Sequence, residues 1–238
     1  MFGNRLLERF VVTALCPLVL PALAAGPGAP TTRQVRVACL GDSITYGAGV
    51  EDRDLNHYPA RLSARLGPGY EVANFGASGA TLTRRGDYPY WDLPEFDAAA
   101  AFAPDIVVIM LGTNDSKLRN RGARGEFAGD LAALADHFAA LPSRPKIWLC
   151  LPPPMFGLLV DFGVDALRTE ILPRIRQVAA EKNTGLIDVY GALDGRADLV
   201  PDGVHPNAAG AAIIADTVFR AISAEQTTAP QGQKQVEE

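Results

Sequence analysis

The chain has 238 residues, of which 48% are hydrophobic and 21% are charged, a size and composition that suit one globular domain with a sizeable core. Its formal net charge is −5 and no long basic run occurs, so neither nucleic acid nor an anionic membrane is expected as a partner. No internal repeat is visible, and we therefore expect a single domain without stable membrane association.

The N-terminal segment has the pattern of an export signal. Arg5 and Arg9 precede an apolar run at residues 10–23, and Ala22-Leu23-Ala24 offers a small-residue cleavage site. A transmembrane helix needs roughly 20 uninterrupted apolar residues, whereas prolines interrupt this run. We therefore expect residues 1–25 to be a signal peptide and the mature chain to be periplasmic or extracellular, with a retained anchor as the less favoured alternative.

Beyond a flexible spacer expected at residues 26–34, apolar runs alternate with segments of helical spacing. The apolar runs predict strands at residues 35–40, 71–75, 105–111, 146–151 and 186–190. Apolar residues at helical spacing predict helices at residues 58–66, 93–102, 124–141, 165–182 and 207–223, with a kink or break at Pro173. The polar stretch at residues 224–238 lacks periodicity and is expected to be disordered.

The alternation of strands with helices defines the predicted fold class. Asp105–Leu111 is the strongest strand, and its unbroken apolar run is typical of a central parallel strand buried on both faces. Strands and helices at these intervals call for right-handed βαβ crossovers. We therefore predict an α/β fold, a three-layer α/β/α sandwich with a five-stranded parallel sheet, in one domain at residues 35–223.

Two cysteines, Cys39 and Cys150, lie inside predicted strands. With one strand between them they would be about 9 to 10 Å apart, given neighbour spacings of about 4.8 Å. A disulfide needs Cα atoms within about 7 Å of each other. We therefore predict two buried free thiols, although the chain is expected to be exported.

Polar groups follow the predicted strands at the points where the strands end. Ser43 follows the first strand, Gly76 the second and Asn114 the third, whereas Asp202 and His205 precede the last helix. Ligands of open α/β sheets lie outside the carboxyl ends of the strands, so we expect these residues to converge on one edge. Hydrolytic acyl transfer needs a nucleophile, a general base, a carboxylate that orients the base and donors for an oxyanion. These residues supply each of those groups.

The spacing of Asp202 and His205 fits the same chemistry. Two intervening residues in a turn let the carboxylate reach Nδ1 of the imidazole while Nε2 faces Ser43. Taken alone, this spacing also fits a solvated turn before a helix, with Asp202 as a local cap. The presence of Ser43 and Asn114 favours the catalytic interpretation.

The chain also resembles a known family, the SGNH (GDSL-type) hydrolases. Four ordered blocks carry the resemblance: Gly41-Asp42-Ser43, Asn74-Phe75-Gly76, Gly112-Thr113-Asn114-Asp115 and Asp202-Gly203-Val204-His205-Pro206. Any one block is weak, but four in order, each in its strand context, are specific. Within the family, the chain is most similar to secreted bacterial carbohydrate acetylesterases of the sialate O-acetylesterase-like and xylan esterase-like kind.

The resemblance implies a flavodoxin-like SGNH hydrolase fold and a role for each matching residue. Ser43 would attack the ester carbonyl, His205 would carry the proton to the leaving alcohol, and Asp202 would orient His205. The backbone N–H groups of Ser43 and Gly76 and the side-chain amide of Asn114 would hold the oxyanion. No metal or organic cofactor is expected, and no zinc-ligand spacing or glycine-rich phosphate loop occurs in the sequence.

Other polar residues have simpler interpretations. His137 lies beside the apolar stripe of its helix and is expected at the surface, and His57 is expected to be structural rather than part of the pocket rim. Ser78 lacks the Gly-x-Ser-x-Gly pattern of a nucleophile elbow. Asp42 and Asp115 are expected to form hydrogen bonds within their own turns rather than act as a glycosidase pair.

The substrate-binding candidates follow the second and fourth strands. Tyr88, Tyr90 and Trp91 could stack on a sugar ring, although packing of Trp91 under its own loop is an equal alternative. Phe156 is a candidate wall of the acyl pocket, and Asp42, next to Ser43, is a further candidate contact. Three arginines that follow Asn114 are expected in a solvated loop rather than in a carboxylate site: Arg119, Arg121 and Arg124.

The leading hypothesis is a secreted serine esterase that removes acetyl groups from a carbohydrate or cleaves another short-chain ester. A lipase, lysophospholipase or thioesterase with the same residues is the first alternative, and the sequence shows no long apolar lid segment that would favour it. A non-catalytic carbohydrate-binding protein and a nucleotide-binding domain are further alternatives. A non-catalytic protein would be expected to lack one of the catalytic residues, and none is missing here. A nucleotide-binding domain would be expected to carry the fingerprint glycines, which are absent.

Overall fold

The computed structural model describes residues 33–228. The predicted signal peptide, most of the predicted spacer and residues 229–238 lie outside the described residues. Within residues 33–228, no helix is both long enough and apolar enough to cross a membrane.

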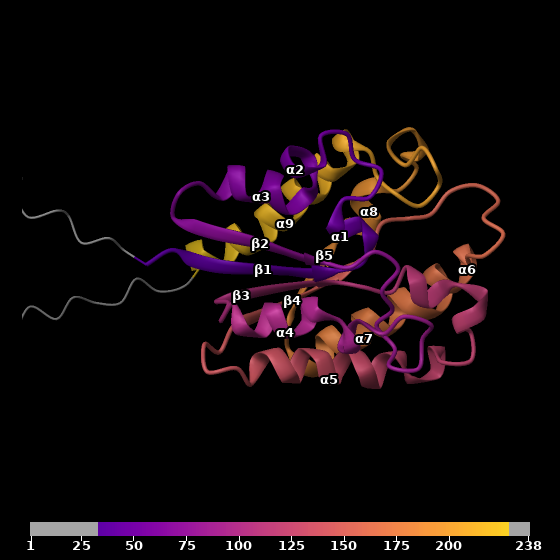
Figure 1. Cartoon of the computed structure of the whole chain (residues 1–238), viewed down its shortest axis with the longest axis horizontal. Helices are drawn as coiled ribbons and strands as arrows, with labels where there is room; N and C mark the ends of the chain where they lie inside the picture. The colour runs from indigo at the N-terminus through magenta and orange to yellow at the C-terminus, as the bar shows by residue number, and fades with distance from the viewer. Residues whose placement is uncertain (1–32, 229–238) are drawn as a thin grey trace, which may run out of the picture. The chain divides into compact units, whose positions relative to one another are not determined.

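A five-stranded parallel sheet forms the centre of the fold (Figure 1). The strands are β1 (Val35–Gly41), β2 (Tyr70–Gly76), β3 (Ile106–Met110), β4 (Lys146–Leu151) and β5 (Gly185–Asp188). Their order in the sheet is β2-β1-β3-β4-β5, so the chain starts near the middle and adds strands first on one side and then on the other. The predicted fold class is confirmed.

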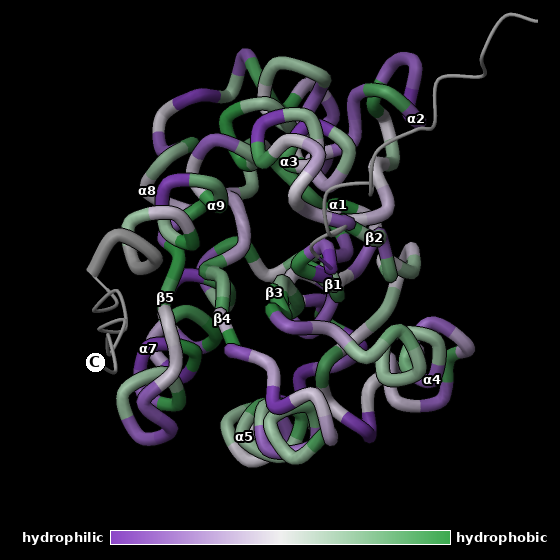
Figure 2. The backbone as a smooth tube through the Cα atoms, turned by 90° about the vertical axis from the view of Figure 1, so that its left-hand side faces the viewer, coloured by the Kyte–Doolittle hydropathy of each residue, from purple (hydrophilic) through white to green (hydrophobic). Residues whose placement is uncertain are grey.

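Helices cover both faces of the sheet (Figures 1 and 2). The longer ones are α3 (Tyr58–Leu66) and α9 (Ala208–Thr228) on one face, and α4 (Pro94–Ala101), α5 (Phe127–Ala139) and α7 (Leu172–Lys182) on the other. Alternate side chains of β1 point to opposite faces, so Val37 and Cys39 enter one core while Ala38 and Leu40 enter the other. Burial on both faces explains why these strands are almost continuously apolar.

Shorter elements connect the layers and carry most of the polar residues of interest. The short α-helices are α1 (Ser43–Tyr46), α2 (Arg53–Asn56), α6 (Val164–Ala166) and α8 (Val189–Leu193). The 3-10 turns are η1 (Tyr90–Asp92), η2 (Asn114–Ser116), η3 (Leu118–Asn120), η4 (Arg124–Glu126) and η6 (Ala197–Leu199). A single π-helical turn, η5 (Leu167–Ile171), lies between α6 and α7.

Two predicted boundaries are corrected by the structure, and the predicted irregularity at Pro173 is confirmed. β5 ends at Asp188 instead of continuing to residue 190, because the Asp188 carboxylate accepts a hydrogen bond from Gly191 N–H at 2.7 Å and starts α8. The predicted helix at residues 165–182 opens into η5 just before Pro173, a residue that lacks an N–H and crowds the preceding turn. α9 continues to Thr228, so the expectation of disorder is wrong for residues 224–228, which precede the first helix breaker, Pro230.

Cys39 and Cys150 are buried free cysteines on β1 and β4, with β3 between them. The prediction of two free thiols is confirmed. Burial raises the pKa of both thiol groups, because the charged thiolate would lose its hydration in the core.

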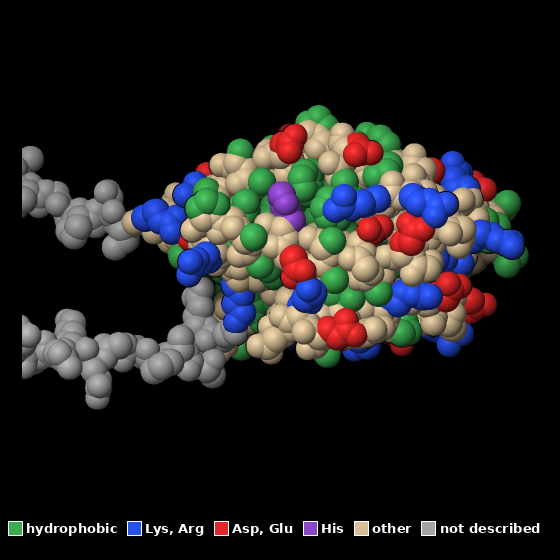
Figure 3. Space-filling view, turned by 90° about the horizontal axis from the view of Figure 1, so that it is seen from below, with side chains coloured by type: hydrophobic (Ala, Val, Ile, Leu, Met, Phe, Trp, Pro, Cys, Tyr) green, Lys and Arg blue, Asp and Glu red, His purple; other side chains and the backbone are tan. Residues whose placement is uncertain are grey.

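The face formed by α4 and α5 carries charges of both signs (Figure 3). Ion pairs at α5 and at the turn before it include Lys182 of α7 with Asp136 at 2.5 Å and Arg85 with Glu126 at 2.6 Å. On this face, acidic groups lie close to the basic ones, which does not favour binding to a polyanion.

The contact between β2 and α1 requires a glycine at residue 76. A Cβ atom placed on Gly76 would lie 2.2 Å from Tyr46 N and 2.7 Å from Thr45 C, both of which are backbone atoms that cannot rotate away. We therefore expect Gly76→Ala to lower the free energy of unfolding by about 1 to 3 kcal/mol, the usual range for overpacking.

Gly129, inside α5, is the matched control, because no atom lies within 4 Å of a Cβ added there. Gly129→Ala should raise the free energy of unfolding by roughly 0.5 to 1 kcal/mol through helix propensity. Urea unfolding followed by circular dichroism compares the two variants. Equal stability of both would show that the close approach at Gly76 is not a constraint.

Candidate active site

Three strands end at the same level of the sheet, which brings their following turns together. Gly41, the last residue of β1, pairs with Gly76 of β2 on one side and with Met110 of β3 on the other. Ser43 begins α1 directly after β1, and Asn114 begins η2 after β3. The carboxyl edge of the sheet therefore holds Ser43, Gly76 and Asn114, as predicted.

Ser43 is held in place by the local structure around α1. The Asp42 side chain caps this helix by accepting a hydrogen bond from Ile44 N–H at 2.9 Å. Gly47 ends the helix with a φ of 94°, a left-handed conformation that favours glycine. Ser43 is 8% exposed, so its side chain is largely buried at the carboxyl edge of the sheet.

A continuous chain of hydrogen bonds joins Ser43 to His205 and His205 to Asp202. The distance from Ser43 Oγ to His205 Nε2 is 2.9 Å, and that from His205 Nδ1 to Asp202 Oδ2 is 2.7 Å. Although 162 positions separate Ser43 from His205 in the sequence, the fold brings the two side chains into contact. Contacts of this kind are what a nucleophile, a general base and a carboxylate that orients the base require.

Asp202 also organises the turn that carries His205. Its Oδ1 accepts hydrogen bonds from the N–H groups of Val204 at 2.9 Å and His205 at 2.6 Å. Partial burial acts to raise the pKa of Asp202, but the hydrogen bonds from His205 and Val204 outweigh it, and the pKa is lowered. Asp202 is therefore negatively charged at neutral pH and can stabilise positive charge on the imidazole.

The predicted oxyanion donors are not equivalent in the structure. Asn114 is buried and donates one side-chain N–H to Ala80 O at 3.0 Å, which leaves its second N–H available. The N–H of Gly76 donates to Asn74 Oδ1 at 2.9 Å, so Gly76 can serve an oxyanion only by sharing or releasing that bond. Asn114 is therefore the stronger candidate.

Asn74 is a residue whose role the sequence analysis missed. Its Nδ2 donates to Thr45 O at 2.9 Å and its Oδ1 accepts from Gly76 N–H, so it ties α1 to the end of β2. The available signal in the sequence was that Asn74 belongs to the Asn74-Phe75-Gly76 block. Asn74 holds α1 against the end of β2 beside Ser43, and Gly76 of the same block is a candidate oxyanion donor.

Asp115 forms its main hydrogen bonds outside its own turn, contrary to the expectation. It is fully buried and accepts hydrogen bonds from Leu82 N–H, Thr83 N–H and Thr83 Oγ1 at 2.9, 2.9 and 2.8 Å. These bonds anchor the long connection after β2 against η2. Burial raises the pKa of Asp115, although the hydrogen bonds act in the opposite direction.

Asp42 is not a substrate contact, and that prediction is also wrong. It is 1% exposed, and its hydrogen bond to Ile44 N–H lies within its own turn, as the alternative interpretation expected. Within residues 33–228, its second oxygen, Oδ2, is buried without a hydrogen bond of standard geometry, and so is the hydroxyl of Thr113, which is nevertheless close enough to lower the pKa of Asp42. Burial raises the pKa of Asp42 from its ordinary value of 3.8 to about 6.

The raised pKa of Asp42 predicts a pH-dependent cost to stability. The folded state binds the proton of the Asp42 carboxyl group more tightly than the unfolded state does. The stabilisation of the folded state by this proton is therefore fully present below pH 3.8 and is lost as the pH rises through about 6. A difference of about 2 units between the folded and unfolded pKa values corresponds to roughly 3 kcal/mol in the free energy of unfolding. Asp42→Asn keeps the cap without a charge, so the variant should gain stability over the wild type between about pH 4 and about pH 7.

Urea unfolding of the wild type and Asp42→Asn across this pH range measures the gain. We expect the two proteins to be similar near pH 4 and the variant to be more stable near neutrality. A difference between them that does not change with pH would contradict the raised pKa.

The aromatic candidates separate into buried and accessible residues. Tyr90 is 0% exposed and its hydroxyl donates to Phe75 O at 2.7 Å, so its prediction as a sugar contact is wrong. Trp91 donates to Leu82 O at 2.9 Å and its ring lies 3.7 Å from the Arg84 guanidinium, so it packs in its own loop, as the alternative expected. Tyr88 is 47% exposed and remains a candidate.

Phe156 lies beside the turn that carries Asp202 and His205. Its N–H donates to Gly203 O at 2.9 Å, and its side chain is half-buried. A Cβ atom on Gly203 would lie 2.3 Å from Phe156 O, so the two segments are in close contact. The position is consistent with the predicted pocket wall.

One of the three arginines after Asn114 is not solvated. Arg124 is 8% exposed and donates to the carbonyl oxygens of Asp115 at 3.1 Å and Ser116 at 2.6 Å. It therefore fixes the segment that follows Asn114, a role that a charged residue in a polar stretch does not reveal. Arg119 and Arg121 lie in a surface segment, and Arg119 contacts Asp87 at 3.5 Å.

The other two histidines have structural or surface positions, as predicted. His57 Nδ1 accepts a hydrogen bond from Ala60 N–H at 3.1 Å and caps α3, and burial lowers its pKa. His137 is exposed, with its ring centroid 4.7 Å from that of Phe96. Neither residue takes part in the hydrogen bonds of Ser43.

Comparison with known proteins defines the class. The model of the GDSL-like Lipase/Acylhydrolase family matches residues 39–213, a range that contains every residue of the candidate site. The chain belongs to this family, which confirms the resemblance of the four sequence blocks. The description of the family names lipases and acylhydrolases.

The sequence relatives are longer proteins. The chain is 38% identical over 212 residues to an acetylxylan esterase of Xylanibacter ruminicola, covering 82% of this chain and 44% of that protein. It is 26% identical over 233 residues to a multidomain esterase of Ruminococcus flavefaciens, covering 81% of this chain and 29% of that protein. The chain thus spans less than half the length of these two curated relatives.

Solved structures share the fold. A carbohydrate acetylesterase from Sinorhizobium meliloti matches with a TM-score of 0.66 and 22% identity, covering 81% of this chain and 100% of that one. The inhibitor-bound aryl esterase of M. smegmatis matches with a TM-score of 0.64 and 23% identity, covering 80% and 99%. These similarities support the α/β architecture.

Proposed function

We propose that this protein is a serine esterase that removes acetyl groups from carbohydrate, with Ser43, His205 and Asp202 as its catalytic residues. The observation that carries the proposal is the chain of hydrogen bonds through His205, 2.9 Å to Ser43 Oγ and 2.7 Å to Asp202 Oδ2. Each catalytic role requires a contact of this length.

The proposed reaction has two halves. Ser43 Oγ attacks the carbonyl carbon while its proton passes to His205 Nε2, and Asp202 stabilises the imidazolium that forms. The bond to the alcohol oxygen then breaks, the alcohol takes the proton from Nε2, and Ser43 is left acetylated. Water attacks this acetyl ester with His205 again as the base, acetate leaves, and Ser43 regains its proton.

The negative charge on the carbonyl oxygen needs donors in each half of the reaction. The free N–H of the Asn114 side chain and the backbone N–H of Ser43 are the proposed donors, and Gly76 N–H joins them if it releases Asn74. Loss of one such donor typically costs about 3 to 4 kcal/mol of transition-state stabilisation.

The carbohydrate substrate is supported by the relatives. The sequence relative with 38% identity is an acetylxylan esterase, and a structural neighbour is a carbohydrate acetylesterase. A panel of p-nitrophenyl esters of increasing acyl length, together with acetylated xylan and acetylated sialic acid, tests the proposal. We expect acetyl esters to be cleaved fastest, acetate to be released from at least one carbohydrate, and the rates to persist in the presence of a chelator.

A lipolytic activity is the second candidate, and one observation favours it. Leu158 and Val160 are 102% and 88% exposed on the segment that follows Phe156, beside the turn with Asp202 and His205. Exposed apolar side chains at this position could contact a longer acyl chain. Faster hydrolysis of octanoate than acetate esters would select this function over the first.

We also propose that the protein is exported. The support is the sequence pattern of Arg5, Arg9 and the apolar run before Ala22-Leu23-Ala24. Expression of the full chain in a bacterial host, followed by fractionation and N-terminal sequencing, tests this. A product that stays in the cytoplasm with its first residues intact would contradict it.

A further inference from the structure

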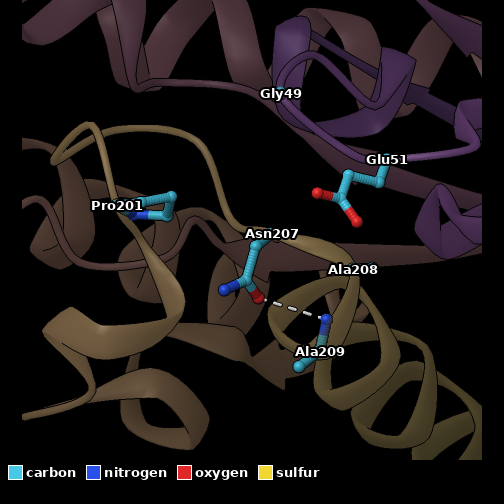
Figure 4. A pocket seen from close by; sticks show the side chains of 6 residues that line it. All are labelled: Gly49, Glu51, Pro201, Asn207, Ala208 and Ala209. Carbon is cyan, nitrogen blue, oxygen red and sulfur yellow. Dashed lines mark hydrogen bonds between the residues drawn. The ribbon is translucent and has the colours of Figure 1, made fainter.

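A cavity of about 420 Å³ lies between the connection from α1 to α2 and the start of α9 (Figure 4). Gly49 and Glu51, on the connection between α1 and α2, form one wall, and residues of the turn before α9 and of its first turn form the other: Pro201, Asn207, Ala208 and Ala209. His205 itself does not line the cavity, but its backbone lies close to both walls. A Cβ atom on Gly49 would lie 3.4 Å from His205 Cβ, and Asn207 is two positions after His205 in the chain.

The proposed reaction decides which part of an ester faces this cavity. The acyl group must lie against Ser43 and the donors at Asn114, whereas the leaving oxygen must reach His205 Nε2 to receive its proton. The alcohol part of the ester therefore extends on the histidine side of the site. In a carbohydrate ester, that part is the sugar chain.

The lining of the cavity suits a neutral polyol. Glu51 is the charged residue among the six that line it, and Figure 4 shows its carboxylate directed toward the opposite wall. Within residues 33–228, the Glu51 carboxylate has neither a hydrogen-bond donor nor an ion-pair partner, so it is free to accept hydrogen bonds from hydroxyl groups. A lone carboxylate would repel a phosphate, sulfate or carboxylate ligand.

The remaining lining residues leave room for such a ligand. Gly49, Ala208 and Ala209 have small or no side chains, and the volume lies within the roughly 300 to 1,000 Å³ of small-molecule sites. Asn207 uses its Oδ1 to accept from Ala209 N–H at 3.1 Å and Gly210 N–H at 3.0 Å, which holds this wall in place. The wall is therefore rigid, whereas Glu51 is exposed and able to adjust.

We propose that this cavity is a subsite for a neutral sugar residue of the chain that bears the ester, with Glu51 as the residue that determines preference for glycan over small esters. The inference rests on the proposed function and deepens it. Glu51 accepts hydrogen bonds from sugar hydroxyls in the subsite and does not touch the reacting atoms.

The test compares two substrates in each variant. We expect Glu51→Ala to lower the ratio of kcat/KM for an acetylated xylo-oligosaccharide to kcat/KM for p-nitrophenyl acetate by about tenfold, since hydrogen bonds to a charged group are of this strength. Glu51→Gln, which keeps the shape, should give a smaller decrease. Any influence of the Glu51 charge on His205 affects both substrates and cancels in the ratio.

Asp52→Asn is the matched control. Asp52 is the next residue, is also exposed, caps no helix with its side chain and does not line this cavity. Its φ of 44° is tolerated by asparagine, so the variant should fold normally and keep the wild-type ratio. Inhibition of p-nitrophenyl acetate hydrolysis by unacetylated xylotriose gives a second readout, which should weaken in Glu51→Ala and not in Asp52→Asn.

The outcomes distinguish the subsite from the function. If the wild type cleaves both substrates and Glu51→Ala keeps the ratio and the xylotriose inhibition, the subsite is wrong while the proposed function stands. If the wild type cleaves p-nitrophenyl acetate but releases no acetate from the oligosaccharide, both the carbohydrate substrate and the subsite are wrong. An equal fall of the ratio in Asp52→Asn would also overturn the role of Glu51.

Discussion

Replacement of Ser43 by alanine is expected to reduce kcat/KM for p-nitrophenyl acetate by about 10⁴ to 10⁶-fold, the loss typical of a missing serine nucleophile. The side chain of Ser43 forms the 2.9 Å contact with His205 Nε2, and without it the imidazole has no hydroxyl group to activate. Alanine keeps the backbone N–H and fits α1, whose cap comes from Asp42 rather than from Ser43. The variant should therefore fold like the wild type.

Ser78→Ala is the control for Ser43→Ala. Ser78 lies on the connection after β2, close in sequence to Gly76, and is exposed. We expect this variant to keep its activity within about twofold, as surface substitutions do. Intact-mass measurement after treatment with a sulfonyl fluoride should show one adduct on the wild type and on Ser78→Ala, and none on Ser43→Ala. Retention of more than a few per cent of the activity by Ser43→Ala would end the case for Ser43 as the nucleophile.

Asp202→Asn is expected to lower kcat/KM by about 10⁴-fold, because it reverses one hydrogen bond while it keeps the others. The asparagine Oδ1 can still accept from Val204 and His205 N–H, so the turn should stay in place. Its amide nitrogen would face His205 Nδ1 as a donor where Asp202 Oδ2 now accepts. Nδ1 would then have to be the acceptor, Nε2 would carry the proton, and the base could no longer take the proton of the nucleophile.

Asp198 provides a matched control in the same connection. It is an exposed carboxylate that pairs with Arg196 at 2.9 Å and makes no contact with His205. Asp198→Asn should keep its activity within about twofold. Because the two variants lose the same charge, a difference between them isolates the bond to Nδ1. If Asp202→Asn kept more than a tenth of the wild-type activity, the carboxylate would not be the group that orients His205.

Much of the fold could be predicted because it depends on local patterns. β3 is an unbroken apolar run, and such a run is stable only between two helical layers. Its neighbours alternate with helical spacing, which restricts the topology to parallel crossovers. The same alternation placed Cys39 and Cys150 on two strands with a third strand between them. Because that separation is too large for a disulfide, it predicted two free thiols.

The boundaries and the polar contacts could not be predicted in the same way. The end of β5 depends on a hydrogen bond from Gly191 N–H to Asp188, and α9 continues to Thr228 through a polar stretch that lacks apolar periodicity. Tyr90, Asp115 and Arg124 have residue types typical of a surface or a site. Tyr90 and Asp115 are satisfied in the core by a carbonyl or N–H groups from a segment farther away along the chain, and Arg124 is satisfied by carbonyl oxygens of the turn just before it.

The sequence by itself determined the layers of this protein and the small set of residues able to perform acyl transfer. Periodicity records which face of each element is buried, and residue type records which chemistry is available. Only the tertiary structure decided which polar residues support the fold and that Glu51 lies across a cavity from Asn207. The physical reason is that hydrogen bonds and cavities depend on distances between atoms far apart in the chain, and no local pattern in the sequence encodes those distances.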